Sequence, residues 1–193
     1  FELTADNMDA VARICKLVQG MPLGIVLAGS WLSMLFPDEI AAEIVQGIDF
    51  LTSDMGDIPE RQPSIRAVFA YSWDCMTSDE KQVFMKLSVF GGGFTREAAE
   101  VVAGANLRTL MTLTNKSLLR RNTDNGRYDI HELLRQYAEE KLNVAGESED
   151  TQDTHMRYFA HLLQQQETIL KGSNPIVARA TIEVDIDNVY RAW

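Results

Sequence analysis

The fold is decided by residues 91–140, which read GGGFTREAAEVVAGANLRTLMTLTNKSLLRRNTDNGRYDIHELLRQYAEE. The stretch opens with a glycine turn. It continues with two short helical patterns, two short strands and a longer helical pattern, expected over 95–103, 107–115, 117–121, 127–130 and 132–144. The pair Asn125-Gly126 between the strands is a strong hairpin signal, because both residues tolerate positive φ. Helices followed by a hairpin and another helix predict a winged-helix domain.

Two more helices are expected directly before this stretch. Ser64 is the predicted N-cap of the first, because its hydroxyl can accept a backbone N–H that has no helical partner. Thr77 and Glu80 have the spacing of a capping box and predict the start of the second.

The whole chain is predicted to be mainly α, in three parts. Residues 1–63 are expected to form a helical subdomain, 64–145 the winged helix with its one β-hairpin, and 146–193 a helical hairpin that starts an α-solenoid. In the first part, helices are expected after an N-cap at Thr4, at Pro22 and at Pro37. The second of these is apolar nearly all round and is expected to be buried.

Irregular segments are expected to separate these parts. Residues 52–63 hold two prolines, a glycine and mixed charges, and predict a connector. Residues 146–153 predict an acidic loop. Two long helices should follow it, joined at Asn174-Pro175, with Ile182, Ile186, Val189 and Trp193 along one face of the second.

Charge is uneven along the 193 residues. The net charge is −10, with 3 basic and 10 acidic residues in 1–63, 11 and 10 in 64–145, and 4 and 8 in 146–193. A protein dedicated to binding a polyanion would show a basic stripe. The acidic flanks therefore argue against such a role for the chain as a whole, while the near-neutral middle part leaves the question open.

Cysteine usage and hydropathy indicate the compartment. Cys15 and Cys75 lie in apolar helical patterns and are expected to be buried free thiols, because neither has a second Cys or a His at metal-ligand spacing. Few cysteines and the lack of a signal peptide predict a cytoplasmic protein. The longest apolar stretch, 21–36, is too short and too interrupted to span a membrane. The chain begins with Phe1, so we expect it to be a piece of a longer protein.

Two residues are candidates for contact with a ligand. Pro22 restarts the chain after Gly20, a position suited to the first turn of a helix, and on its own it is simply a helix-starting proline. His131 stands where the second predicted strand gives way to a helix. Its imidazole could donate to a phosphate there, aided by the positive end of the helix dipole, or it could cap its own backbone.

Enzymatic chemistry is not expected. Residues 91–93 are not a phosphate loop, because the pattern GxxxxGK[ST] occurs nowhere in the chain. His155 and His161 are expected to be solvated residues of one helix, and with His131 they form no Ser-His-Asp or Cys-His arrangement. Residues 182–187 alternate like a strand that could bind Mg²⁺, but the helical interpretation accounts for more residues and is preferred, so no metal site is expected.

Several segments together resemble the NB-ARC, or STAND, signalling ATPases. Residues 20–22 (GMP) resemble their GxP motif, and residues 130–132 (IHE) resemble their MHD motif, with Ile for Met and Glu for Asp. The series that is most similar to bacterial regulators of the AfsR and LuxR-like kind is completed by residues 72–74 (SWD), 87–94 (LSVFGGGF), 116–119 (KSLL) and 186–189 (IDNV). The P-loop domain of that family is absent and would lie upstream of Phe1.

This resemblance implies a regulatory role without catalysis by the chain itself. Pro22 would lie against the adenine of a bound nucleotide, and His131 would contact the β-phosphate of ADP and hold a closed, inactive state. ADP or ATP is expected in the full-length protein, with none tightly bound to this chain. The expected partners are the upstream nucleotide-binding domain and downstream TPR-like repeats in cis, together with other proteins, and no membrane.

The alternative, from a different class of function, is a winged helix that binds DNA in a transcriptional regulator. The candidate recognition helix offers Arg108 and Lys116 as cations, and the wing adds Arg120, Arg121 and Arg127. That is few for neutralising phosphates beside acidic flanks, so DNA is not the expected partner.

Overall fold

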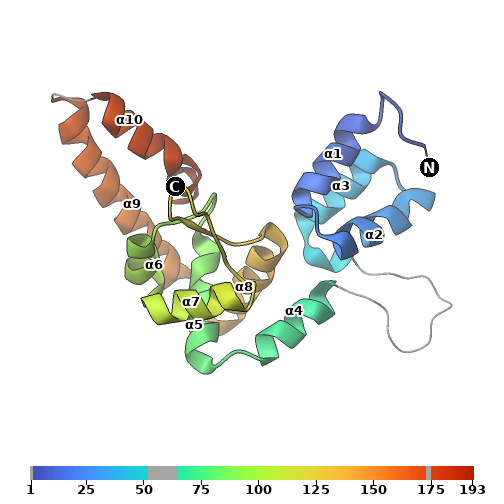
Figure 1. The fold of residues 1–193 in the computed structure, drawn as a ribbon, viewed down its shortest axis with the longest axis horizontal. Coiled ribbons are helices and arrows are strands. Elements are labelled where there is room, and N and C mark those ends of the chain that lie inside the picture. Colours follow the sequence, from blue (N-terminus) through green and yellow to red (C-terminus); the bar gives the residue numbers. More distant parts are fainter. Residues whose placement is uncertain (1, 52–64, 173–174) are drawn as a thin grey trace. The chain divides into compact units, whose positions relative to one another are not determined.

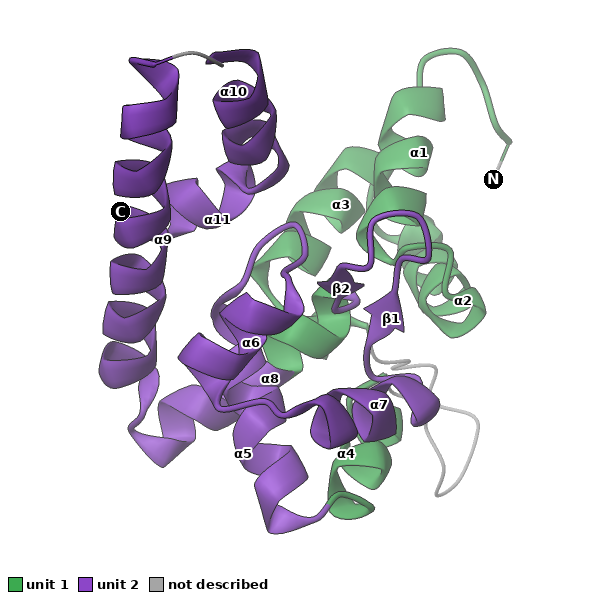
Figure 2. Cartoon of the chain, turned by 60° about the vertical axis from the view of Figure 1, so that its left-hand side comes forward, with its two compact units in different colours: residues 1–76, 132–137 green, residues 77–131, 138–193 purple. Residues whose placement is uncertain are grey.

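A computed structural model describes residues 2–51, 65–172 and 175–193 of the chain. Two compact units emerge, which we call unit 1 (residues 1–76 and 132–137) and unit 2 (residues 77–131 and 138–193) (Figure 2). The described residues are mainly α with one two-stranded hairpin, which confirms the predicted fold class. The domain boundaries at 63 and 145 stay a prediction. The expected connector at 52–63 and the N-cap Ser64 lie outside the described residues.

Unit 1 is built from short helices. They are α1 (Met8–Leu17), α2 (Pro22–Ser30), η1 (Trp31–Ser33), α3 (Pro37–Gln46), η2 (Ile48–Phe50), α4 (Ile65–Asp74) and the first residues of α8 (Glu132–Ala145) (Figure 1). Helix α1 packs against α3, and Val18, Ile40 and Ile44 are buried in the core. The Trp31 ring stacks on Phe50 with centroids 4.9 Å apart, and its N–H donates to the Phe50 carbonyl at 3.2 Å.

Two expectations for unit 1 were wrong. Helix α1 begins at Met8 instead of after Thr4, because the Asn7 side chain accepts the Thr4 N–H at 2.9 Å and closes a turn ahead of the helix. Helix α2 is not buried all round, since Ile25 and Val26 are exposed within the chain. Only one side of α2 is covered, and Gly24 lies there: a Cβ at this position would stand 2.9 Å from the Val18 Cβ atom.

Unit 2 contains the winged helix and the C-terminal helices. Its elements are α5 (Ser78–Lys86), η3 (Leu87–Val89), α6 (Arg96–Ala103), α7 (Leu107–Asn115), β1 (Arg120–Arg121), β2 (Tyr128–Asp129), the later residues of α8, α9 (Ser148–Leu170), α10 (Pro175–Val184) and α11 (Ile186–Arg191). The predicted capping box is present, because the Thr77 side chain accepts the Glu80 N–H while Glu80 accepts the Thr77 N–H. Thr95 caps α6 as predicted, by accepting the Ala98 N–H at 3.1 Å.

The wing is shorter than predicted but has a third partner. Arg120 lies opposite Asp129, and Arg121 lies opposite Tyr128, in an antiparallel pair of two-residue strands. Phe94 forms an isolated bridge with Tyr128, through two backbone hydrogen bonds of 2.8 Å. This bridge ties the segment after the glycine turn to the wing.

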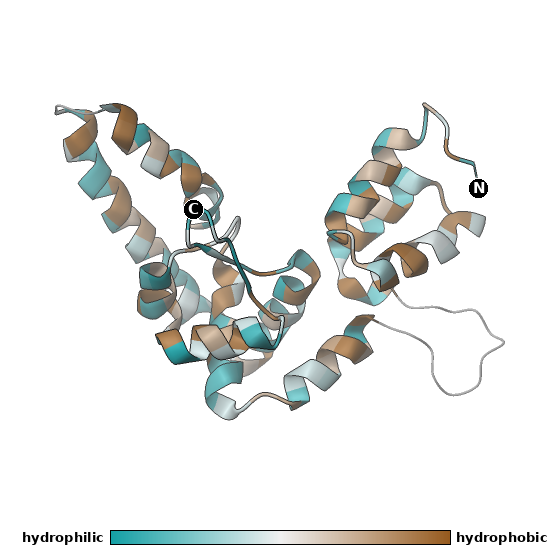
Figure 3. Cartoon of the chain, viewed as in Figure 1, coloured by the Kyte–Doolittle hydropathy of each residue, from teal (hydrophilic) through white to brown (hydrophobic). Residues whose placement is uncertain are grey.

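The C-terminal helices pack on the winged helix within unit 2. Helix α9 lies along α6 and α10, and Figure 3 shows hydrophobic and hydrophilic residues alternating along it, as in an amphipathic helix. Phe159 of α9 is buried against Phe90, with ring centroids 6.3 Å apart, and Phe90 in turn lies 4.7 Å from Phe94. One aromatic cluster thus joins α9 to the winged helix.

Two expectations for the C-terminal helices were also wrong. The segment 146–153 is not an acidic loop, because α9 begins at Ser148 with Glu149 and Asp150 in its first turn, where acidic side chains favour the helix dipole. The last helix is not continuous. It breaks at Asp185, whose side chain is buried, and restarts as α11.

Candidate functional site

Pro22 occupies the predicted place at the start of a helix. It is the first residue of α2 and is exposed, and the chain turns ahead of it through Gln19 and Gly20, with φ of 46° and 71°. The helix-starting role is therefore confirmed. Its contact with a nucleotide stays a prediction.

His131 lies half-buried directly before α8, as predicted from the junction of strand and helix. The next residue, Glu132, accepts hydrogen bonds from Arg135 Nε at 2.9 Å and Nη2 at 2.8 Å. Glu132, which occupies the position of Asp in the MHD motif, is thus bound by Arg135 of the same helix. Pro22 belongs to unit 1 and His131 to unit 2, and a phosphate contact by His131 stays a prediction.

The candidate recognition helix offers little positive charge. Leu107 and Met111 are each 56% exposed on α7, so apolar side chains occupy much of its outer face beside Arg108. Lys116 donates from Nζ to Glu80 Oε2 at 2.7 Å, and this hydrogen bond is the largest cause of a lowered pKa at Glu80. One of the two cations counted from the sequence on this helix is therefore paired with a carboxylate.

The wing has one exposed pair of arginines. Arg120 and Arg121 are exposed and, with Asn122, Thr123 and Asp129, line an open cavity of about 340 Å³. Arg127, six residues further along the chain, is half-buried, with only 11% of its side chain exposed. Arg108, Lys116, Arg120 and Arg121 are thus exposed on this candidate DNA surface, and Lys116 is paired with Glu80.

Arg127 belongs to a cluster that we call the polar junction, formed by Arg127, Asp185, Asn188 and the glycine turn Gly91–Gly93. The Arg127 Nη2 atom lies 2.5 Å from Asp185 Oδ1, and the Arg127 Nη1 atom lies 3.3 Å from Asp185 Oδ2. The side chains of this bidentate pair are only 11% and 8% exposed. Arg127 Nη2 also donates to the Gly93 carbonyl at 2.9 Å. Each charge is thus paired and hydrogen-bonded, as a buried ion pair requires.

Asn188 supplies the second half of the polar junction. Its Oδ1 atom accepts the Gly91 N–H at 2.8 Å, while Nδ2 donates to the Gly93 carbonyl at 2.7 Å and to Asp185 Oδ1 at 3.1 Å. The side chain is fully buried. Arg191 adds a hydrogen bond from Nη1 to the Ser88 carbonyl at 3.3 Å. Side chains of α11 and of the break before it therefore satisfy the backbone of the glycine turn.

Backbone conformation and close packing both favour glycine in this turn. Gly92 and Gly93 have φ of +75° and +86°, which confirms the predicted positive φ. A Cβ at Gly92 would lie 2.6 Å from Asp187 Oδ2, and one at Gly91 would lie 2.8 Å from the Arg191 Cδ atom. The glycines thus permit the close approach of α11 as well as the turn.

His155 borders the polar junction and was misplaced by the sequence analysis. It is 2% exposed instead of solvated, with its ring 5.1 Å from Phe90 and 4.7 Å from Phe159. Burial lowers its pKa to about 4, while a hydrogen bond to Asn188, which favours the protonated ring, opposes the shift. Within the described residues its Nε2 atom has no hydrogen-bond partner. His155 is therefore neutral near pH 7, whereas His161 is exposed as predicted.

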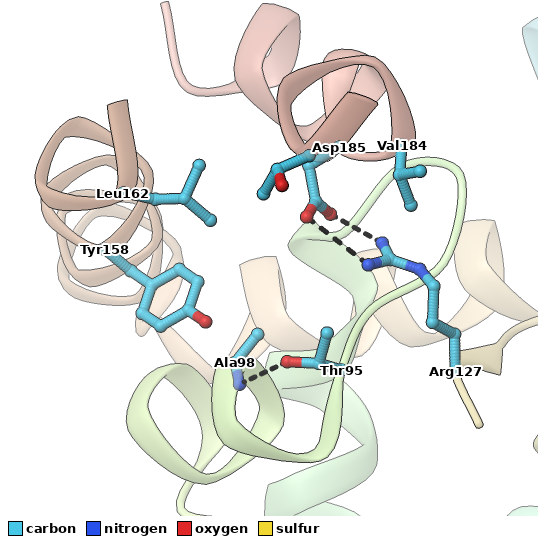
Figure 4. A pocket seen from close by; sticks show the side chains of 8 residues that line it. Thr95, Ala98, Arg127, Tyr158, Leu162, Val184 and Asp185 are labelled. Atoms are coloured by element: carbon cyan, nitrogen blue, oxygen red, sulfur yellow. Dashed lines mark hydrogen bonds and ion pairs between the residues drawn. The ribbon is translucent and has the colours of Figure 1, made fainter. Parts of the chain in front are cut away.

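A cavity lies beside the polar junction (Figure 4). It has a volume of about 260 Å³ and is lined by Thr95, Ala98, Arg127, Tyr158, Leu162, Thr181, Val184 and Asp185. Burial raises the pKa of the Tyr158 phenol, and a hydrogen bond with Thr95 opposes the shift. The cavity is thus mainly apolar, with hydroxyl groups and one internally neutralised ion pair.

Metal and membrane chemistry find no support in the part of the chain that the structure describes. It holds no group of three His, Cys, Asp or Glu residues placed to bind a metal ion, and none of its helices has the length and apolar character needed to cross a membrane. Both cysteines are free of disulfides, but Cys15 is half-buried and Cys75 exposed, so the expectation of two buried thiols was wrong.

Sequence analysis missed the roles of Asp185 and Asn188. They stand three residues apart in a helical pattern that is otherwise apolar at Ile182, Ile186 and Val189, so the pattern places them on the apolar face. Two polar residues on a buried face are the signal that could have indicated a partner such as Arg127.

Comparisons with known proteins find relatives that are named as transcriptional regulators. No protein-family model matches the chain. The chain is 31% identical over 203 residues to proteins of Mycobacterium tuberculosis and Mycobacterium bovis named "Putative HTH-type transcriptional regulator", with 100% of this chain and 23% of each relative aligned. It is 29% identical over 187 residues to a Mycobacterium tuberculosis protein named "Uncharacterized protein", with 91% of this chain and 47% of that protein aligned.

The chain thus spans about a quarter of the length of the first relatives. By sequence it is similar to one segment of mycobacterial proteins that are named as transcriptional regulators of the helix-turn-helix type.

Proposed function

We propose that the chain is a regulatory segment of a transcriptional regulator, in which the winged helix relays a signal to the C-terminal helices. The observation that carries this proposal is the polar junction. The wing uses Arg127, and the glycine turn uses its backbone, to hold Asp185 and Asn188 of the C-terminal helices. Elements joined by buried, fully paired polar groups move together, because separating them would leave charges uncompensated.

The signal in this proposal is the state of a bound nucleotide. Its support is the resemblance of residues 20–22 and 130–132 to motifs of NB-ARC or STAND ATPases. In the intact protein, an upstream P-loop domain would hold ADP or ATP, Pro22 would lie near the adenine and His131 near the β-phosphate. The chain alone would neither hydrolyse ATP nor bind ADP more tightly than roughly 10 µM, because it lacks the P-loop cradle. We place the intact protein in the cytoplasm.

The relay needs two states that bind the two nucleotides differently, since a ligand with equal affinity for both shifts nothing. A hydrogen bond from His131 to phosphate in only one state would supply such a difference. The junction would then pass the change to the helices that follow.

DNA binding by this winged helix is the second candidate function. The names of the relatives support DNA binding more directly than they support the nucleotide switch. They mention a helix-turn-helix, and they do not mention a nucleotide. The exposed Arg108, Arg120 and Arg121 could contact phosphates. Against it stand the apolar Leu107 and Met111 on the outer face of α7. The relatives' names do not say which segment holds the helix-turn-helix.

The substitution His131→Ala in the intact regulator tests the nucleotide switch. A charge-assisted hydrogen bond is worth about 1.5–3 kcal/mol, so its loss should speed ADP release by roughly one to two powers of ten. The melting temperature of the 193-residue chain should barely change. His161→Ala, an exposed histidine, is the matched control. If His131 only caps its own backbone, the chain should instead lose about 1 kcal/mol of stability. Unchanged ADP release would rule out the phosphate contact.

A further inference from the structure

The cavity beside the polar junction is built like a small-molecule site. Leu162 and the Tyr158 ring come from α9, Ala98 comes from α6, and Asp185 and Arg127 close the opposite side (Figure 4). Its lining therefore joins parts of the winged helix to the helical hairpin that follows it. We propose that this cavity binds a small, uncharged, mainly apolar molecule that carries one hydrogen-bonding group.

The volume sets the size of the molecule. At about 260 Å³ the cavity is larger than the roughly 150 Å³ that hold benzene in an engineered protein cavity, yet it falls below the range of about 300–1,000 Å³ typical of drug-sized ligands. A molecule with one or two small rings fits these limits.

The charges in the lining argue for a neutral ligand. Arg127 and Asp185 form a bidentate pair in which each is at most 11% exposed, so they neutralise one another. A charged ligand would have to be desolvated without a free counter-charge, or would have to break this pair, and either change is costly.

Hydroxyl groups supply the polar recognition. Thr95 accepts the Ala98 N–H, and Thr181 donates to the Val177 carbonyl, yet a hydroxyl has one donor and two acceptor positions. With the Tyr158 phenol, these groups retain acceptor capacity around an apolar cavity. An N–H or O–H on a ring is the group that they suit.

A ligand in this cavity would contact the polar junction directly, because both Arg127 and Asp185 line the cavity. This inference goes beyond the proposed function and does not require it. The cavity lies wholly within unit 2, and its ligand could bind whether the winged helix relays a nucleotide signal or reads DNA.

Calorimetric titration of the full chain with indole and with p-cresol tests the proposal, and indole-3-acetate serves as the charged counterpart. Ligands of this size reach dissociation constants of roughly 0.1–1 mM. We expect saturable binding of a neutral probe in that range, at least tenfold weaker binding of the charged probe, and a higher melting temperature with the neutral probe.

Two substitutions on one helix locate the site. Leu162→Trp should fill the cavity and weaken indole binding at least tenfold, while Leu170→Trp, on an exposed position of the same helix, should leave it unchanged. Should Leu162→Trp fail to fold by circular dichroism, Thr181→Val provides a milder change and should weaken binding severalfold. Absence of saturable binding by both neutral probes would overturn the proposal. So would equal binding to the chain with tryptophan at 162, or equal affinity for the charged probe.

Discussion

The two sides of the wing hairpin use arginine in opposite ways. Arg120 and Arg121 of β1 are exposed to solvent, whereas Arg127, just before β2, has only 11% of its side chain exposed and forms an ion pair with Asp185. These arginines contribute equally to any count of charge in the sequence. Only the exposed pair is available to an external partner, while Arg127 holds two parts of unit 2 together. A basic wing is therefore not by itself a DNA-binding wing.

The largest expected effect comes from removing the partner of the buried arginine. Asp185→Ala leaves Arg127 uncompensated, and breaking a buried pair in this way costs about 3–5 kcal/mol. Urea unfolding followed by circular dichroism measures the loss. Glu183→Ala is the matched control, because Glu183 forms an exposed pair with Arg179 that should contribute less than about 1 kcal/mol.

A double-mutant cycle sharpens this result. Replacing both members, with Arg127→Met and Asp185→Leu, should cost less than the sum of the two single changes, since no buried charge is left unpaired. Additive losses would mean that the two side chains act independently, and the polar junction would then have no energetic basis.

The next effect is a pH dependence from His155 beside the junction. Its pKa is about 4 in the folded chain and 6.5 in the unfolded chain, so on acidification the unfolded state binds its proton first. Stability is therefore lost as the pH falls from about 6.5 to 4, by up to about 3 kcal/mol. Two charged groups also act on the His155 ring. The charge of Arg191 lowers the pKa of His155, and the charge of Asp185 raises it.

Unfolding free energies of the wild type and of His155→Gln, measured between pH 7 and 4.5, check this prediction. The glutamine variant should have a flatter profile, because it cannot bind the proton. His161→Gln, at an exposed position, should keep the wild-type profile. Parallel profiles for wild type and His155→Gln would show that His155 does not contribute to the loss.

The smallest expected effect is the difference in stability between two glycine-to-alanine variants, which separates the cost of backbone conformation from the cost of packing. Gly92 and Gly104 both have positive φ, of 75° and 66°, so alanine at either site costs about 1–2 kcal/mol for the backbone alone. Only at Gly92 would the new Cβ also meet Asp187, whereas nothing lies within 4 Å of one at Gly104. Gly92→Ala should therefore lose about 1 kcal/mol more than Gly104→Ala in chemical unfolding. Equal losses would mean that the glycine turn does not need to accommodate α11.

Local signals in the sequence predicted local structure well. The capping box of Thr77 and Glu80 and the Asn125-Gly126 turn each depend on neighbours a few residues away, and both the helix and the hairpin are present. Features that depend on distant partners escaped prediction. Asp185, where the last helix breaks, is paired with a residue 58 positions away in the chain, and His155 is buried against Phe90 of a distant segment and Phe159 of its own helix.

The residues of the candidate site also divide into those placed by their neighbours in the sequence and those placed by distant partners. The helix start at Pro22 and the place of His131 before α8 follow from adjacent residues and were predicted. The polar junction could not be predicted, because its members lie at 91–93, 127, 185 and 188, and only the folded chain brings them together. The polar residues Asp185 and Asn188 on an apolar helix face indicate that a partner exists, but they do not identify it.

Our central proposal, that this winged helix serves the polar junction and does not read DNA, is tested most directly by DNA binding of the 193-residue chain. Duplexes selected from a randomised library would be labelled, and fluorescence anisotropy measured at about 150 mM salt, where most non-specific attraction is lost. We predict no selected sequence and only weak, salt-sensitive binding, reduced further by Arg120→Ala with Arg121→Ala. A selected duplex bound with submicromolar affinity at that salt concentration, and lost in the double variant, would contradict the account.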